Sequence, residues 1–141
     1  MGSEQKVIKK EGVWTVDGRP REKIEFLSQK TSSNIPGKLI ITLLVTLPPN
    51  TATPPHRHNG AAVTGLVIKG TTLNQMNDDE PFESSAGETF FEAPGCHHRR
   101  GENNTDQECQ FFALFVIDEK TVLEGGPESL MQLDADQEET S

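Results

Sequence analysis

Turn-forming residues recur along this chain at intervals of about ten residues, and this spacing constrains its fold more than any other feature. Clear examples are Asp17-Gly18, Pro36-Gly37, Asn59-Gly60, Gly87 and Pro94-Gly95. Between the turns lie short runs rich in β-branched and aromatic residues, the longest at 38–47, 62–69 and 111–117. Short strands at this spacing are typical of an all-β sandwich or barrel, so the sequence predicts one all-β domain.

We expect three segments within this domain. Residues 1–37 form an N-terminal extended arm and outer strands, 38–120 form the barrel, and 121–141 form a C-terminal segment. The best helical candidate is the short stretch 127–133. The last segment ends in an acidic run at 134–139 that contains four carboxylates, and such tails are usually solvated and disordered.

The charge balance excludes some partners. The chain carries 22 acidic and 13 basic residues, a net charge of −9, and it has no basic stripe. A polyanion would be repelled, so nucleic acid is not an expected partner. The first residues lack the apolar stretch of a signal peptide, and the apolar run at 39–47 is too short to span a bilayer. We therefore expect a cytoplasmic protein without membrane contact.

All four histidines fall in two clusters, and this clustering is the most informative chemical feature of the sequence. His56 and His58 are separated by one residue, so on a strand both project from the same face. Two prolines precede them and favour extended backbone. Two imidazoles on one face can reach the same metal ion. A third ligand would come from His97 or His98, which follow the turn at Pro94-Gly95.

The first cluster resembles the first sequence motif of the cupin family. Asn50 is followed by five residues, then His56-x-His58, and then Gly70, where the family has glycine, five residues, His-x-His, three or four residues, glutamate, six residues and glycine. The family spacing puts Val63 or Ala62 at the position of the glutamate. Neither residue can bind a metal, so the resemblance implies a cupin that lacks this ligand.

The second cluster is similar to the second cupin motif. Gly87 is followed by five residues, then Ala93-Pro94-Gly95, two residues, and His98. Glu102 stands at the asparagine of the family pattern. The resemblance implies a cupin barrel, also called a double-stranded β-helix or jelly roll, over Leu39–Ile117. It also implies that His98, rather than its neighbour, is the third metal ligand.

Other residues near the motifs are candidates for the pocket or its rim. Because side chains alternate along a strand, His97 should point away from the barrel. It is then either a rim residue or one that contacts a metal-binding side chain without binding the metal itself. Cys96 shares the parity of His98 and is either a small buried hydrophobe or a pocket residue, and Gln75 is a further pocket candidate. Glu88 and Glu92 flank two phenylalanines, and we expect them at the surface, with a proton-shuttle role for one as the alternative.

The predicted cavity walls are apolar. One wall is formed by Val63, Gly65 and Val67, and another by either 111, 115 and 117 or 112, 114 and 116. Such a pocket suits a small oxygenated molecule of phenolic, polyketide-like or diketone-like character. We expect one divalent metal ion, with Fe(II) favoured and Zn, Mn or Ni as alternatives.

The predicted function follows from the metal site. It is a metal-dependent cupin enzyme, with a dioxygenase favoured over a redox-neutral lyase, decarboxylase or isomerase that uses Zn or Mn. A non-catalytic cupin that binds a small ligand is the alternative from another class. The expected partners are a small-molecule substrate and a second copy of the chain in a homodimer.

Overall fold

The computed structural model describes residues 6–140 of the 141-residue chain, with side chains described for 6–138. Its strands are β1 (Val7–Lys10), β2 (Val13–Val16), β3 (Lys23–Lys30), β4 (Lys38–Leu47), β5 (Ala52–Thr53), β6 (His56–Arg57), β7 (Ala62–Lys69), β8 (Thr71–Met76), β9 (Phe82–Ser85), β10 (Thr89–Glu92), β11 (His98–Glu102), β12 (Cys109–Asp118) and β13 (Gln132–Leu133). The helices are α1 (Glu119–Gly125), the 3-10 helix η1 (Pro127–Leu130) and α2 (Asp134–Thr140).

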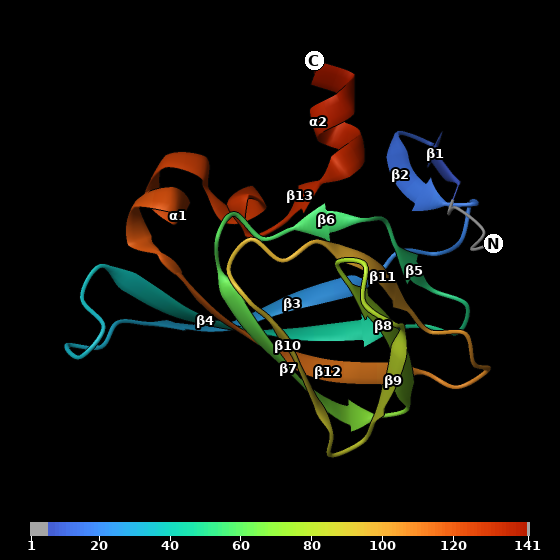
Figure 1. Ribbon diagram of the computed structural model, residues 1–141, viewed down its shortest axis with the longest axis horizontal. Helices are drawn as coiled ribbons and strands as arrows, with labels where there is room; N and C mark the ends of the chain where they lie inside the picture. Colours follow the sequence, from blue (N-terminus) through green and yellow to red (C-terminus); the bar gives the residue numbers. More distant parts are fainter. Residues whose placement is uncertain (1–5, 141) are drawn as a thin grey trace.

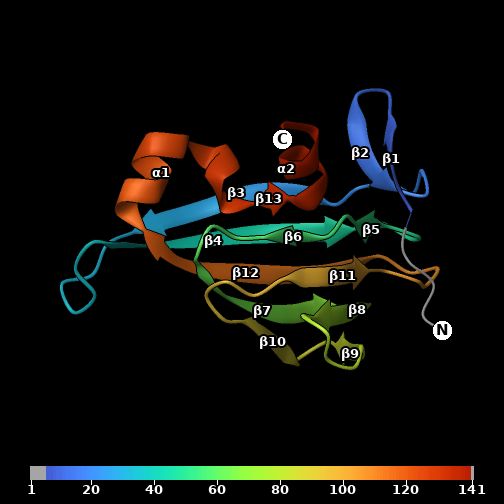
Figure 2. The ribbon, with the colours of Figure 1, turned by 45° about the horizontal axis from the view of Figure 1, so that its top comes forward.

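Two antiparallel sheets form the body of the molecule, and they lie one over the other in Figures 1 and 2. One sheet has the order β10-β7-β12-β4-β3. The other has the order β13-β6-β11-β8-β9, with β5 also paired to β11. Non-consecutive strands are neighbours in both sheets, as in a jelly roll. The predicted all-β barrel is therefore confirmed.

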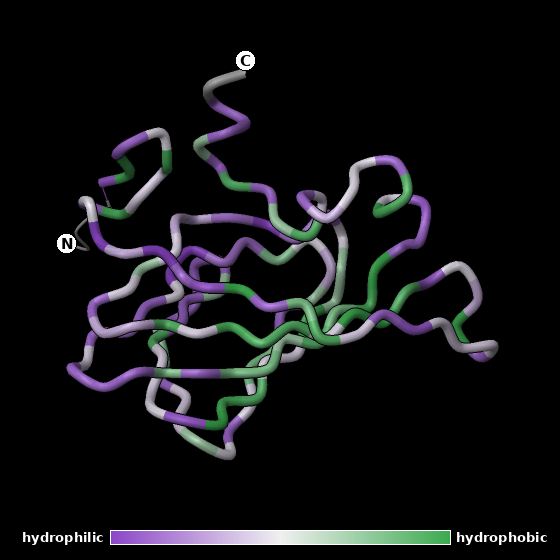
Figure 3. Tube along the Cα trace, turned by 180° about the vertical axis from the view of Figure 1, so that it is seen from behind, coloured by the Kyte–Doolittle hydropathy of each residue, from purple (hydrophilic) through white to green (hydrophobic). Residues whose placement is uncertain are grey.

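The core lies between the two sheets because their strands alternate buried and more accessible residues. Along β4 every second residue is buried, from Leu39 to Leu47, and the facing positions of β12 contribute Ala113, Phe115 and Ile117. Figure 3 shows the longest hydrophobic stretches along these central strands, with hydrophilic residues concentrated at turns. This alternation fixes which side chains face the interior, and so it also positions the site.

The C-terminal segment, where the sequence predicts an acidic tail, contains η1, β13 and α2. Strand β13 pairs with β6, and the backbone N–H of Asp134 donates to the carbonyl of Pro55 at 3.0 Å. Leu133 and Ala135 are buried, so hydrophobic contact and backbone pairing hold the segment against the barrel. The predicted helix at 127–133 is a 3-10 turn followed by this strand. Helix α1 buries none of its residues. The sequence therefore has no helical periodicity of apolar residues from which this helix could be predicted.

The N-terminal residues form a hairpin, β1–β2, beside the C-terminal helix (Figure 1). The indole N–H of Trp14 donates to the carboxylate of Asp136 at 3.1 Å. Strand β3 forms the edge of the five-stranded barrel sheet, where it pairs with β4. Residues 1–5, which bear on the predicted absence of a signal peptide, lie outside the described residues. Among residues 6–140, no helix has the length and apolar character needed to cross a membrane. The division at 37 and 120 stays a prediction.

Candidate metal centre

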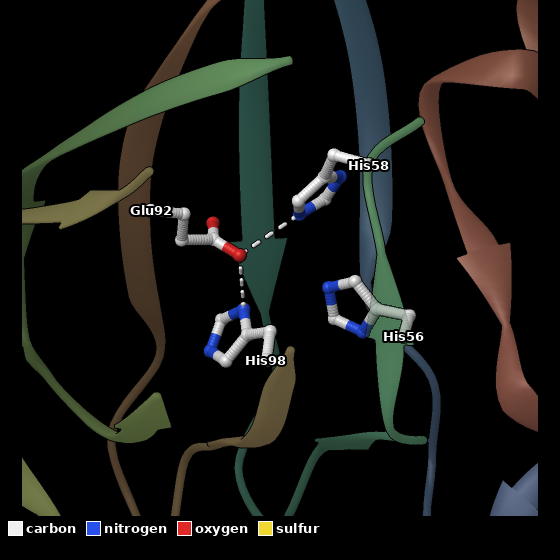
Figure 4. Close-up of side chains that lie close together, drawn as sticks. All are labelled: His56, His58, Glu92 and His98. Carbon is white, nitrogen blue, oxygen red and sulfur yellow. Dashed lines mark ion pairs between the residues drawn. The ribbon is translucent and has the colours of Figure 1, made fainter. Parts of the chain in front are cut away.

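Four buried side chains meet inside the barrel. His56 and His58 come from the segment of β6, His98 is the first residue of β11, and Glu92 is the last residue of β10. Figure 4 shows the three imidazoles and the carboxylate converging on one point, and one ligand atom from each lies within 4.8 Å of the others. None of the four is more than 8% exposed.

The prolines before the first histidine pair set the direction of its side chains. The short strand β6 follows the two prolines, and His56 and His58 are buried while Arg57 between them is exposed. The guanidinium of Arg57 donates to the carbonyl of Gly95 at 2.8 Å, on the outside of the barrel. The predicted alternation is thus present, and it directs both imidazoles inward.

Strand pairing brings the third imidazole to the first two. His98 is the cross-strand partner of His56, and their ring centroids lie 4.9 Å apart. The adjacent His97 does not join the cluster. Its Nε2 lies 2.7 Å from a carboxylate oxygen of Asp134, and the side chain is partly exposed. The structure therefore brings together the three histidines that the resemblance implies and leaves His97 at the rim.

Glu92 is the functional residue that the sequence interpretation misplaces. A surface position is expected for it, but it is 3% exposed and lies inside the barrel. It is the cross-strand partner of Val63, the position at which the family spacing puts its glutamate. The signal was present, since strand alternation from the buried Phe90 turns Glu92 inward as well. The carboxylate is therefore supplied by β10 rather than β7.

Each histidine has one ring nitrogen held by an oxygen outside the cluster. His56 Nδ1 donates to the carbonyl of Pro54 at 2.8 Å, and His58 Nδ1 donates to the carbonyl of Leu130 at 2.7 Å. His98 Nε2 donates to Oδ1 of Asn74 at 2.9 Å. These contacts orient the rings and leave the other nitrogen of each facing the shared point. Such outer contacts are usual around metal-binding histidines.

Charge interactions prepare the site for a cation. Burial, together with the nearby His98 and His58, holds the pKa of His56 well below its usual value. Burial also acts to lower the pKa of His58, but the adjacent carboxylate of Glu92 outweighs it and raises this pKa. Burial acts to raise the pKa of Glu92, and the two adjacent histidines outweigh it and hold this pKa far below its usual value. At neutral pH Glu92 is ionised and His56 is neutral.

Two buried polar atoms without hydrogen-bond partners indicate that the four clustered side chains suit a metal ion. Glu92 Oε1 lies 3.0 Å from both His58 Nε2 and His98 Nδ1. Even so, Glu92 Oε1 and His98 Nδ1 have no hydrogen-bond partner among the described residues. Buried polar atoms without partners are costly, and a shared cation would satisfy both. Imidazole nitrogen and carboxylate oxygen are common donors to first-row divalent ions.

The cluster opens on an internal cavity of about 80 Å³. Its walls are mostly apolar, and they include the predicted Val63, Phe111 and Phe115. Ala113 lines it in place of Ile117, which lies in the core. Gly65 does not line it, because the ring of Phe90 fills the space above that residue.

Two other pocket candidates lie elsewhere. Gln75 is not among the residues that line the cavity, and its amide donates to the carbonyl of Asp79. The preceding residue, Asn74, faces inward instead, because alternation along β8 buries it. Cys96 is buried among core residues, and burial raises the pKa of its thiol, so it is the small buried hydrophobe of the two alternatives.

Comparison with known proteins places this geometry in a family. A family model described as a cupin domain matches residues 43–117, more than half of the chain. A double-stranded β-helix protein from Klebsiella pneumoniae is similar at 14% identity and TM-score 0.59, over 70% of this chain and 79% of that one. A conserved barrel protein of the same family from Salinispora arenicola is similar at 18% identity and TM-score 0.56, over 73% and 81%.

An oxalate oxidase solved with the substrate analogue glycolate is similar at 22% identity and TM-score 0.53, over 74% of this chain and 58% of that one. These likenesses show a shared fold. No curated protein was found to match the chain. The family match over both histidine motifs, together with the barrel that carries them, shows that this chain belongs to the cupin family.

Proposed function

We propose that this chain is a metal-dependent cupin enzyme that holds one divalent ion on His56, His58, His98 and Glu92. The observation that carries the proposal is the convergence of four buried ligand atoms at an internal cavity. Three imidazoles and a carboxylate are costly to bury unless they are paired or bind a metal. Fe(II) is the favoured ion, with Zn, Mn or Ni as alternatives.

The chain's own groups have separate roles around the ion. A divalent ion here would supply Lewis acidity and open coordination positions. The ionised Glu92 adds one negative charge and a proton acceptor at the cavity. The carbonyls of Pro54 and Leu130 hold the rings of His56 and His58 in orientation. The apolar walls exclude water, which strengthens the electrostatic interactions of any bound molecule.

The volume of the cavity favours a compact substrate. Pockets for drug-sized ligands measure about 300–1,000 Å³, whereas this cavity measures about 80 Å³. The phenolic and polyketide-like molecules expected from the sequence are therefore less suited than a molecule of a few non-hydrogen atoms. The oxalate oxidase of the same fold was solved with glycolate, a two-carbon acid, so small acids are the first compounds to try.

Oxidation with dioxygen is the reaction class we favour, and a redox-neutral cleavage or isomerisation is the second candidate. The second is supported by Glu92, because an ionised carboxylate beside the cavity suits proton transfer. A non-catalytic ligand-binding barrel is the remaining alternative. The sequence supports this alternative mainly because the first motif lacks its glutamate. Glu92 places a carboxylate beside the three histidines and so weakens that argument.

Metal analysis of purified protein, followed by oxygen uptake with small acids and a phenol panel, tests the proposal. We expect one ion per chain and turnover of a compact acid. Replacement of His56, His58 and His98 by alanine should abolish both. Iron binding without oxygen uptake on any compound would favour the redox-neutral reaction. A protein that binds no divalent ion at all would contradict the proposal.

A further inference from the structure

The amide of Asn74 stands at the wall of the cavity behind one of the proposed metal ligands. Asn74 is on β8, it is 1% exposed, and its cross-strand partner is Gly101 on β11. Both residues line the cavity. A Cβ atom at Gly101 would lie 3.1 Å from Nε2 of His98, so the glycine leaves room for the histidine ring beside the amide.

The two ends of this amide have different surroundings. Its Oδ1 accepts the N–H of His98 Nε2 at 2.9 Å, which fixes the direction of the group. Its Nδ2 is fully buried and has no hydrogen-bond partner among the described residues. Burial of an unpaired N–H donor is unfavourable, so an acceptor is needed from whatever occupies the cavity.

No other lining side chain competes for this role. Thr53 donates its hydroxyl to Glu22 at 2.7 Å, and Arg21 holds the same carboxylate with two further hydrogen bonds. Neither lysine nor arginine is among the residues that line the cavity. Recognition of an oxygen-bearing molecule here therefore depends on the metal and on Asn74.

The donor set indicates which molecules fit. Metal-binding imidazoles are neutral and a metal-binding carboxylate is ionised, so a divalent ion held by Glu92 and the three histidines would carry a net charge of about +1. A singly charged anion neutralises that charge in the apolar cavity, where an uncompensated charge is costly.

We propose that Asn74 Nδ2 donates a hydrogen bond to a carboxylate or carbonyl oxygen of the substrate, and that the substrate is a compact monocarboxylic acid. This inference rests on the proposed function, because it needs the metal site. Asn74 is then a residue of two roles: one end of its amide orients His98, and the other end recognises the substrate.

Two variants separate these roles. Asn74→Asp keeps an oxygen to accept from His98 and loses the N–H donor, whereas Asn74→Ala loses both without adding charge. Gln75→Ala is the matched control, because Gln75 is the next residue of the same strand and points away from the cavity. Co(II) affinity is measured by competition with a chelator. Glycolate and neutral ethane-1,2-diol are then titrated into the Co(II) protein by calorimetry.

We expect wild type and Gln75→Ala to bind Co(II) and glycolate and to bind the diol much more weakly. Asn74→Asp should keep Co(II) affinity, and both Asn74 variants should bind glycolate about 10- to 100-fold more weakly, as for a lost hydrogen bond to a charged group.

Each other result overturns a distinct claim. No Co(II) binding by wild type would sink the metal site and this inference with it. Co(II) binding with equal glycolate affinity in wild type and Asn74→Ala would leave the metal site standing and remove the role of Asn74. A wild-type Co(II) protein that ignores glycolate, or that binds the diol equally well, would refute the monocarboxylate class.

Discussion

Glu92 on β10 faces Val63 on β7 as its cross-strand partner, and the two side chains share the inner surface of the barrel. The family spacing puts a glutamate ligand at the position of the valine, and this chain provides the carboxylate from the adjacent strand. Paired positions on neighbouring strands are about 5 Å apart, so a carboxylate can reach the same metal from either one. The change conserves the donor set while altering the strand that delivers it.

We therefore expect the carboxylate to be exchangeable between the two strands. Glu92→Gln should weaken divalent metal binding by at least about tenfold, since loss of even an outer contact commonly costs 10- to 100-fold. The double variant Val63→Glu/Glu92→Val should recover part of the loss. Chelator competition measures both. Unchanged affinity in Glu92→Gln would show that this carboxylate is not a ligand.

Asn59 directly follows His58, and it connects this part of the chain to the 3-10 helix η1. Its amide donates to the carbonyl of Ser129 at 2.5 Å. Its φ is +53°, so Asn59→Gly removes the amide without straining the backbone. We expect a loss of about 1 kcal/mol in the free energy of unfolding and a weaker metal affinity, because the neighbouring Leu130 carbonyl holds His58.

Asn50→Gly is the matched control for this change. Asn50 also has a positive φ, of +67°, and it accepts from Arg19 only through its backbone carbonyl. It should lower stability slightly and leave metal affinity unchanged. Equal effects of both variants on metal affinity would rule out the specific link through Asn59. Urea unfolding and chelator competition give the two quantities.

The interior of the barrel leaves no room for a side chain at Gly65. A Cβ there would lie 2.2 Å from the ring of Phe90, which is buried on the adjacent strand. Gly65→Ala should destabilise the fold by about 1–3 kcal/mol through overpacking. Gly65→Ala/Phe90→Leu should recover much of that loss in thermal unfolding. A fully stable single variant would contradict the packing seen here.

Glu102 should contribute to stability in a pH-dependent way. Burial acts to raise its pKa, but hydrogen bonds from Arg100 and Asn104 outweigh this and lower it. A lowered pKa in the folded state means that the contribution is complete above the unfolded value of about 4.3 and is lost as the pH falls through the folded value. Glu102→Gln should lower the free energy of unfolding by about 2 kcal/mol at pH 7. It should also reduce the decrease of that free energy as the pH falls below the unfolded value. An unchanged pH dependence in urea unfolding would argue against this.

Homodimer formation stays a prediction, and we expect it at the outer face of the five-stranded sheet that contains β7, β10 and β12. Leu66, Phe91 and Leu114 are 39–57% exposed on adjacent strands of this sheet. Exposed apolar residues that gather on one face commonly mark an interface. Leu66→Glu/Leu114→Glu should halve the mass seen by light scattering, whereas Leu123→Glu on α1 should not. A monomeric wild type would refute the expectation.

The histidine ligands could be predicted because their signals are local. Alternation within a strand places His56 and His58 on one face, and a turn with its family spacing places His98. Glu92 and Asn74 could not be assigned in the same way. Alternation from Phe90 turns Glu92 inward, but whether Glu92 or Asn74 reaches the histidines depends on which strands are neighbours and in what register. The sequence pattern of a single strand does not contain that information. The same holds for the C-terminal segment, whose order comes from pairing with β6.

The contact between His58 and the carbonyl of Leu130 spans 72 residues of sequence. During synthesis both histidine motifs emerge well before the residue that orients His58. The barrel strands can pair at that stage, but this imidazole lacks its carbonyl partner until Leu130 has been made and β13 has paired with β6. Full orientation of the three imidazoles therefore depends on a segment that is synthesised after both motifs.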